Sequence, residues 1–533
     1  MSVQNRRWLA VPIGGTALAV AGLVVLGPGS AEARPGVALS PVPAANARVP
    51  GIVAPDVLSP QLRQAVVVQG ANPVENPTDW ATHYGYNGDG PLVPLPGTTA
   101  EATKTEPDKN TYLVLRGQHG ADSHYDYGSH FLFQGHETGK GGYVTRVNLD
   151  ADGSHKVTVI ATRDAGGAPL PVFDGSVWDP FSRTLLFTAE LGANGGVWQV
   201  QPDFQGASTA RDISGSLGRG GYEGIQLDRA GNVWIVEDSG GPAAGANGKG
   251  KQPNSFVYRF VPAHRGDLSR GRLQALRLDR APAPLDADSQ FEADVHSYGT
   301  RFATTWVTLH DTATDGTAPF DANAAAKARG ATPFKRPENG QFRPGSDFGE
   351  FYFTETGDTN ALSPFNAGKG GWGSIFKLSQ RDPRADTGTL RLVYTGNAAH
   401  AGFDNLSFLD DRRLLVVEDA GDTLHAQRNG LDSGYAVDVT HDYADGSDPV
   451  RFLAEGRDAS ATLDSALAGT PGFQNEGDNE ITGIHVSDGD ASVGGLIGTS
   501  VPRPFDGRWR VFWTQQHGDN VTWEILRAAD GGD

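Results

Sequence analysis

The chain has 533 residues, a formal net charge of −19, 71 glycines, 33 prolines and no cysteine. The acidic balance argues against a nucleic-acid partner, which would need a basic surface. The lack of cysteine excludes disulfides and disfavours a zinc site. Abundant glycine with moderate proline indicates many short strands joined by turns, and so an all-β protein.

The N-terminus has the features of an export signal. Arg6 and Arg7 precede an apolar stretch at 17–27, and Ala31 and Ala33 form an A-x-A cleavage pattern. We predict a signal peptide over residues 1–33 that uses the twin-arginine route, so that the mature protein is secreted or associated with the cell envelope, with no membrane contact. The alternative is an uncleaved anchor, although the apolar run is shorter than the roughly 20 residues that a span requires.

Beyond the signal, residues 34–62 are rich in Ala, Pro and Val and lack periodicity. We interpret them as a linker or a wrapping arm. No shift in composition divides residues 63–533, which are predicted to form one domain. The best candidate for a helix there is the short segment 321–330.

A β-rich run that ends at an acid or amide followed by glycine recurs along the chain. Repetition of this kind predicts a β-propeller, and the uneven spacing predicts insertions between its blades. The runs are "SHFLFQGHETG" (129–139), "TLLFTAELG" (184–192), "NVWIVEDSGG" (232–241), "EFYFTETGD" (350–358), "RLLVVEDAGD" (413–422) and, with two glutamines in place of the acid, "RVFWTQQHGD" (510–519).

Some of these runs belong to predicted hairpins with polar residues at both ends. Glu223 opens the hairpin 220–238, Asp404 and Asn405 open 403–419, and Glu480 opens a similar segment at 479–490. In a propeller, such strand ends converge on the central axis.

Converging carboxylates repel one another unless a cation lies among them, and hard oxygen ligands suit Ca²⁺. The residues alone leave Fe³⁺ and Mn²⁺ open. The alternative is that each acid caps a turn or pairs with an arginine, which would be the better reading for a single site. The recurrence favours metal.

A further segment, "FKRPENGQF" at 334–342, places Arg336 two residues before Glu338. On extended backbone these side chains point the same way. Glu338 can hold a metal while the planar fork of Arg336 binds an anionic oxygen of the substrate. The alternative is a local ion pair on a loop.

The chain lacks the G-x-S-x-G elbow of serine hydrolases and the P-loop. It resembles the PhoX-type alkaline phosphatases, with similar segments in the same order along most of the mature chain. These segments are "HYGYNGD" (83–89), "GHETG" (135–139), "DGSVWDPFSRTLLFTAE" (174–190), "YEGIQLDRAGNVWIVED" (222–238), "RPENG" (336–340), "FYFTETGD" (351–358), "DNLSFLDDRRLLVVEDAGD" (404–422) and "ITGIHVSDGD" (481–490).

The resemblance implies a six-bladed propeller whose Fe³⁺ and Ca²⁺ cluster hydrolyses phosphate monoesters, with a small phosphorylated substrate. It implies that Arg336 binds the phosphate and that Arg336 and Glu338 take part in catalysis. We expect a monomer. The predicted metal ligands, from the resemblance and the hairpin pattern together, are Asp174, Glu190, Glu223, Glu338, Glu418, Asp419 and Glu480.

Two departures from the family affect this expectation. The family's cysteine ligand of iron is missing, and Asp174 lies near its position, which favours Ca²⁺ over Fe³⁺. The family's second phosphate-binding arginine is also missing. Thr423 lies near its position, and Arg428 is the first arginine that follows. Two alternatives therefore remain: another calcium propeller hydrolase such as a lactonase, and a calcium-binding propeller without phosphatase activity.

Overall fold

The structure is a computed structural model that describes residues 37–49, 56–86, 92, 104–206, 210–242, 250–282, 285–456, 480–516 and 520–529. The chain divides into residues 1–37 and a compact unit, 38–533. The predicted signal peptide lies outside the described residues. In the described ranges, no helix is long and apolar enough to cross a membrane.

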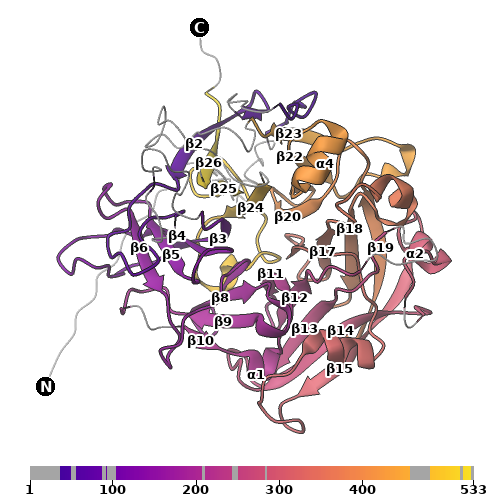
Figure 1. The fold of residues 1–533 in the computed structure, drawn as a ribbon, viewed down its shortest axis with the longest axis horizontal. Helices are drawn as coiled ribbons and strands as arrows, with labels where there is room; N and C mark the ends of the chain where they lie inside the picture. The colour runs from indigo at the N-terminus through magenta and orange to yellow at the C-terminus, as the bar shows by residue number, and fades with distance from the viewer. Residues whose placement is uncertain are drawn as a thin grey trace, which may run out of the picture. The chain divides into compact units, whose positions relative to one another are not determined.

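The compact unit consists of five antiparallel sheets arranged around a common centre (Figure 1). Two four-stranded sheets come first. One holds β3 (Pro107–Val114), β4 (His130–His136), β5 (Val144–Asn148) and β6 (Val157–Ala161), and the other holds β7 (Ser176–Asp179), β8 (Thr184–Ala189), β9 (Gly196–Val200) and β10 (Arg211–Asp212).

A nine-stranded sheet follows. In spatial order it holds β11 (Tyr222–Leu227), β12 (Val233–Glu237), β13 (Val257–Pro262), β14 (Gly271–Leu278), β15 (Phe302–Asp311), β19 (Thr387–Thr395), β18 (Ser374–Gln380), β17 (Glu350–Glu355) and β16 (Gly340–Phe342).

The last two sheets each take a strand from near the start of the chain. One holds β20 (Phe403–Phe408), β21 (Arg413–Glu418), β22 (Ser433–Asp438), β23 (Val450–Ala454) and β1 (Val57–Leu58), and the other holds β24 (Glu480–Ser487), β25 (Arg510–Gln516), β26 (Val521–Arg527) and β2 (Leu62–Val68).

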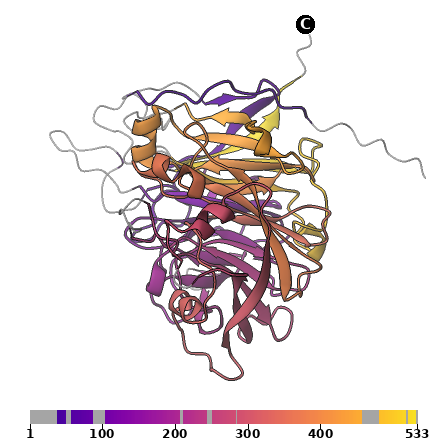
Figure 2. The same ribbon diagram turned by 90° about the vertical axis from the view of Figure 1, so that its right-hand side faces the viewer.

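The described helices are short and lie in the connections between strands. In the side view of Figure 2, the orange segment that contains α4 lies at the left, at one end of the strands. The helices are α1 (Ser214–Leu217), α2 (Gln290–Val295), α3 (Ala322–Ala328), which lies within the predicted helical segment, and α4 (Gly421–Arg428), with 3-10 turns η1 (Gly192–Asn194), η2 (Ser363–Lys369), η3 (Tyr443–Asp445) and η4 (Val493–Gly495).

The first strands of successive hairpins form a closed ring. Strands β3, β7, β11, β16, β20 and β24 each contact the next, and β24 contacts β3. This arrangement confirms the predicted all-β, propeller-like fold. The sheets do not separate into the six predicted blades, because β15 pairs with β19 and joins two groups of strands into one sheet.

Residues near the start of the compact unit tie the ring together. β2 pairs with the C-terminal strand β26, with Ala65 opposite Glu524, and β1 pairs with β23. The Val42 amide donates to the Arg451 carbonyl at 2.8 Å. The segment 34–62, interpreted as a linker or arm, therefore supplies β1 and the first residue of β2, and the pairing of β1 covers an edge of its sheet that would otherwise be open.

Apolar side chains fill the space between neighbouring sheets. On β4, Phe131 and Phe133 pack in the same core cluster as Phe187 of β8, whereas Leu132 packs with Tyr112 in another cluster. Successive strand residues point to opposite faces, so the side chains of one strand pack in two different core clusters. This packing fixes the sheets against each other and thereby positions the strand ends at the centre of the ring.

Candidate metal centre

Each strand of the central ring carries an acid at or just before its start. These acids come from segments far apart in the chain, and the ring brings the strand starts together. The acids are Asp108 (β3), Asp174 (before β7), Glu223 (β11), Glu338 (before β16), Asp404 (β20) and Glu480 (β24).

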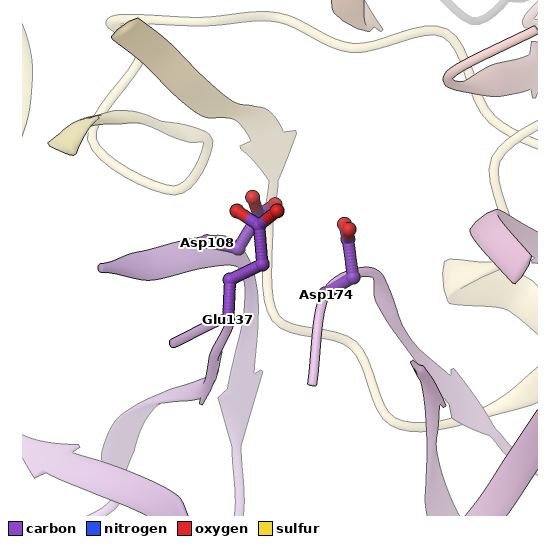
Figure 3. A group of neighbouring side chains, drawn as sticks. All are labelled: Asp108, Glu137 and Asp174. Atoms are coloured by element: carbon purple, nitrogen blue, oxygen red, sulfur yellow. The ribbon is translucent and has the colours of Figure 1, made fainter. Parts of the chain in front are cut away.

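Five of these acids, with Glu137 after β4 and Glu190 after β8, meet through their carboxylate oxygens in three overlapping groups. Within each group, one oxygen from every residue lies within 4.8 Å of the others. Figure 3 shows the first group, in which the carboxylates of Asp108 and Glu137 lie next to each other and Asp174 extends from a neighbouring segment. We call all three groups together the carboxylate cluster: Asp108–Glu137–Asp174, Asp174–Glu190–Glu223 and Glu223–Glu338–Asp404.

At the end of the second strand of a hairpin, neighbouring residues alternate in direction: one side chain bonds away from the carboxylate cluster and the next one contacts it. His136, the last residue of β4, hydrogen-bonds inside its sheet with Thr105 and Thr145, while the next residue, Glu137, joins the carboxylate cluster. At the end of β25, Gln515 donates to Glu455, whereas Gln516 donates to Asp108 and Glu137 at 2.8 Å. The alternation follows from the strand geometry, which sends neighbouring side chains to opposite sides.

The same alternation separates two predicted ligands, Glu418 and Asp419. Glu418 is fully buried and accepts hydrogen bonds from Arg428 at 2.9 and 3.1 Å and from the backbone amide of Ser433 at 2.9 Å. Its oxygens also accept from Ala401 N and Tyr435 Oη. The structure thus places Glu418 in a buried ion pair with Arg428 of α4, and not in the carboxylate cluster.

Asp419 and Glu480 border the carboxylate cluster. Burial raises the pKa of both, and the charge of Arg336 opposes the shift in Asp419. The charges of Asp419 and Glu137 raise the pKa of Glu480 further. Neither residue belongs to one of the three compact groups.

Arg336 lies at the edge of the carboxylate cluster in a tightly held conformation. Its Nε donates to Asp238 at 2.8 Å, its Nη1 donates to Thr359 at 2.7 Å, and its Nη2 lies 3.5 Å from Glu338 Oε1. Its φ is 56°, a left-handed conformation that costs free energy in a residue with a side chain. The side chain remains 18% exposed, so a ligand can reach it.

The carboxylate cluster concentrates negative charge in a buried space. Burial raises the pKa of Asp174, Glu223 and Glu338 well above the usual range, and neighbouring acids raise it further. For the same reasons the pKa of Asp108 is about 6 and that of Glu137 is about 8. Such a group of acids is stable in its ionised form only with cations among its members.

The donor set fits a hard cation. Every candidate ligand in the three groups is a carboxylate oxygen, the donor type that Ca²⁺ prefers. Asp174 Oδ1 is buried with no hydrogen-bond partner within the described part of the chain, as expected of an oxygen that binds an ion.

The sequence analysis did not include Asp108, Glu137 and Asp404 among the predicted ligands. Glu137 and Asp404 stand in segments that it had singled out, and the alternation along the strand ends selects them. Asp108 begins a strand in "EPDKNTYLV" (106–114), where no preceding apolar run marks it. Asp108 can be recognised by its position, because it stands at the start of a ring strand just as Glu223 and Asp404 do.

The fold and the site together define a propeller-like protein with an all-oxygen centre for hard cations. Residues 247–492 match the family described as "Alkaline phosphatase PhoX", which confirms the predicted resemblance to that family over this part of the chain. This match, with the fold, supports hydrolysis of phosphate esters as the activity of the chain.

One solved structure supports the fold, and a second gives a weaker alignment. The chain is similar to Pseudomonas fluorescens PhoX in complex with vanadate, a transition-state analogue, with 14% identity and a TM-score of 0.54 over 91% of this chain and 98% of that one. A gluconolactonase from Xanthomonas campestris aligns with 11% identity and a TM-score of 0.37 over 92% of this chain and 100% of that one. No curated protein shows a significant match to the sequence.

Proposed function

We propose that the protein is a calcium-dependent phosphatase that hydrolyses a small phosphate monoester at the carboxylate cluster. The observation that carries the proposal is the placement of Arg336 beside three overlapping groups of carboxylates, in a chain that matches the PhoX family. The oxygen-only donor set and the absence of cysteine support Ca²⁺ over Fe³⁺.

The residues of the carboxylate cluster would hold the ions. Asp174 and Glu223 each belong to two of the groups and would bridge neighbouring ions. Ions bound there would polarise the phosphoryl oxygens and neutralise the charge that develops in the transition state.

Arg336 would orient the phosphate. Asp238 engages its Nε and Nη2, which fixes the plane of the guanidinium, and Thr359 accepts from Nη1. A planar fork held in this way can bind two phosphate oxygens, and a side chain that is already positioned loses less entropy on binding. Thr356 donates to Glu338 Oε1 at 2.7 Å and so orients that carboxylate.

The proposal extends to the number of blades. The nine-stranded sheet contains two ring strands, β11 and β16, each followed by its own antiparallel strands, and the two halves join only where β15 pairs with β19. This pattern supports a six-bladed propeller in which two blades share one continuous sheet.

The proposal also includes the cell location. The residue pattern at 1–33 supports export by the twin-arginine route and cleavage of the signal. We propose that the released protein is a monomer. Sequencing of the mature N-terminus should begin near Arg34, whereas a protein that retains its first residues would contradict cleavage.

The phosphatase is favoured over the two alternatives. A lactonase site requires no phosphate-binding arginine, and a calcium-binding propeller without activity requires no accessible arginine beside the acids. The family match also favours a phosphatase.

The test combines metal analysis with an assay on p-nitrophenyl phosphate. We expect more than one calcium ion per chain, and activity that a chelator removes and added calcium restores. Metal-loaded protein that hydrolyses no phosphate ester above background would contradict the proposal and favour the binding propeller.

A further inference from the structure

A buried lysine lies at the centre of the ring. Lys109 follows Asp108 on β3, is 1% exposed, and donates from Nζ to Asn339 Oδ1. Asn339 follows Glu338, just before β16. In the order of the ring, β16 lies opposite β3, separated from it by β7 and β11 on one side and by β20 and β24 on the other. The Lys109 side chain therefore reaches across the centre.

The acids around Lys109 come from all three groups of the carboxylate cluster. The carboxylates that attract its ammonium are Asp404, Asp108, Glu223 and Asp174. Their charges oppose the effect of burial, which lowers the pKa of Lys109 to about 8. These are the same carboxylates that would hold the metal ions.

Lys109 also lines a small cavity of a different character. The cavity has a volume of about 50 Å³, and apart from Asp490 its other lining residues are neutral groups such as Ser176, Gln226, Gln341 and His485. Burial and the charge of Lys109 lower the pKa of His485 to about 3, so this histidine is neutral. The strongest attraction on the ammonium therefore comes from the carboxylate cluster.

We propose that Lys109 is a built-in counter-ion of the metal centre, a fixed positive charge that partly neutralises the acids before the metal ions bind. Once ions are present, Lys109 repels them and so limits their affinity. The inference rests on the proposed metal binding, and it assigns to Lys109 a positioning role in the assembly of the site.

Replacing Lys109 with an uncharged residue should change the stability of the metal-free protein more than that of the metal-loaded protein. In Lys109→Met, the acids lose their internal cation, so the metal-free protein should be less stable than the wild type. Bound calcium can replace that charge, so the loaded protein should keep most of its stability. Removing a unit charge close to a divalent ion in a buried site should tighten calcium binding by about tenfold or more.

The experiment measures Tm in calcium and in chelator, together with calcium affinity by calorimetry. Lys335→Met is the matched control, because Lys335 is also 1% exposed but donates to the Lys369 carbonyl and lies 3.6 Å from Asp358. The control should lower Tm equally in both conditions. Lys109→Arg, which keeps the charge, should behave like the wild type more closely than Lys109→Met does.

The proposal predicts a larger calcium-induced increase in Tm and tighter calcium binding in Lys109→Met than in the wild type. Equal losses of Tm in both conditions, or weaker calcium binding, would overturn it. Failure of Lys109→Met to fold even in calcium would also overturn it, because a counter-ion that calcium can replace must be dispensable in the loaded protein. The calorimetry on the wild type tests the proposed function independently of Lys109: if the wild-type protein binds no calcium, the proposed calcium-dependent function fails.

Discussion

Two buried groups of acids in this molecule have opposite environments. Around Glu418, each carboxylate oxygen has donors within its own sheet, and Arg428 bridges Glu418 to Asp432. In the carboxylate cluster the acids lie against one another with neutral donors such as Gln516 and Thr356, and Asp174 Oδ1 has no partner in the described ranges. The first group is a structural ion pair, and the second has the charge and geometry of a cation site.

The two kinds of environment occur at adjacent residues, because neighbouring side chains at a strand end point to opposite sides. Glu418 and Asp419 are neighbours in the chain, yet the strand sends one into its sheet and the other toward the centre. Glu237 and Asp238 divide in the same way: Glu237 accepts from Tyr258 at 2.7 Å, and Asp238 pairs with Arg336. A pair of acids at a strand end therefore contains one structural residue and one residue of the site.

The largest expected effect is the loss of stability in Glu418→Gln. Removing the charge leaves Arg428 with only Asp432 as an anionic partner in a buried space, and breaking a buried ion pair typically costs about 3–5 kcal/mol. Denaturant unfolding measures this loss. The metal content of the folded fraction should stay unchanged. A loss of calcium without a loss of stability would show that Glu418 belongs to the metal site and not to a structural ion pair.

In contrast to Glu418→Gln, Glu223→Gln should reduce metal binding and activity without lowering the stability of the metal-free protein. Glu223 belongs to two groups of the carboxylate cluster, so the substitution should remove metal and lower kcat by about 10³-fold. Stability measured in chelator should rise or remain constant, because one repelling charge is gone. Steady-state kinetics and elemental analysis test this, and a variant with wild-type metal content and activity would contradict the assignment of the site.

Arg336→Lys should leave metal binding intact and damage turnover. Lysine keeps the positive charge but lacks the planar fork, so phosphate is held less well and the rate should fall by about 10²-fold. Glu338→Gln is the comparison variant, since it should lose metal as well as activity. A lysine variant with unchanged kcat/KM would show that Arg336 does not bind the phosphate.

The smallest effect concerns pH. Folding raises the pKa of Asp108 from 3.8 to about 6 and that of Glu137 from 4.5 to about 8, so the folded state binds protons more tightly than the unfolded chain. Their contribution to stability is present at low pH and is lost as the pH rises from about 4 to about 8. In chelator, Tm should therefore fall over this range, and calcium should reduce the fall. A metal-free protein whose Tm rises toward pH 8 would contradict this.

The fold class and much of the site could be predicted from sequence because both follow from periodic patterns. Apolar runs that end in an acid identified Glu190 and Asp419, and hairpin openings identified Glu223 and Glu480. The patterns could not show that β15 would pair with β19, because that pairing joins segments about ninety residues apart. They also could not distinguish Glu418 from Asp419, since the exact strand end decides which residue faces inward.

The most direct test of the account is anomalous X-ray diffraction from crystals grown with calcium. The account predicts ion peaks within the carboxylate cluster, between Asp108, Glu137 and Asp174 and between Glu223, Glu338 and Asp404, and no peak beside Glu418. Peaks confined to other surfaces, or a calcium ion bound to Glu418 with the carboxylate cluster empty, would contradict it.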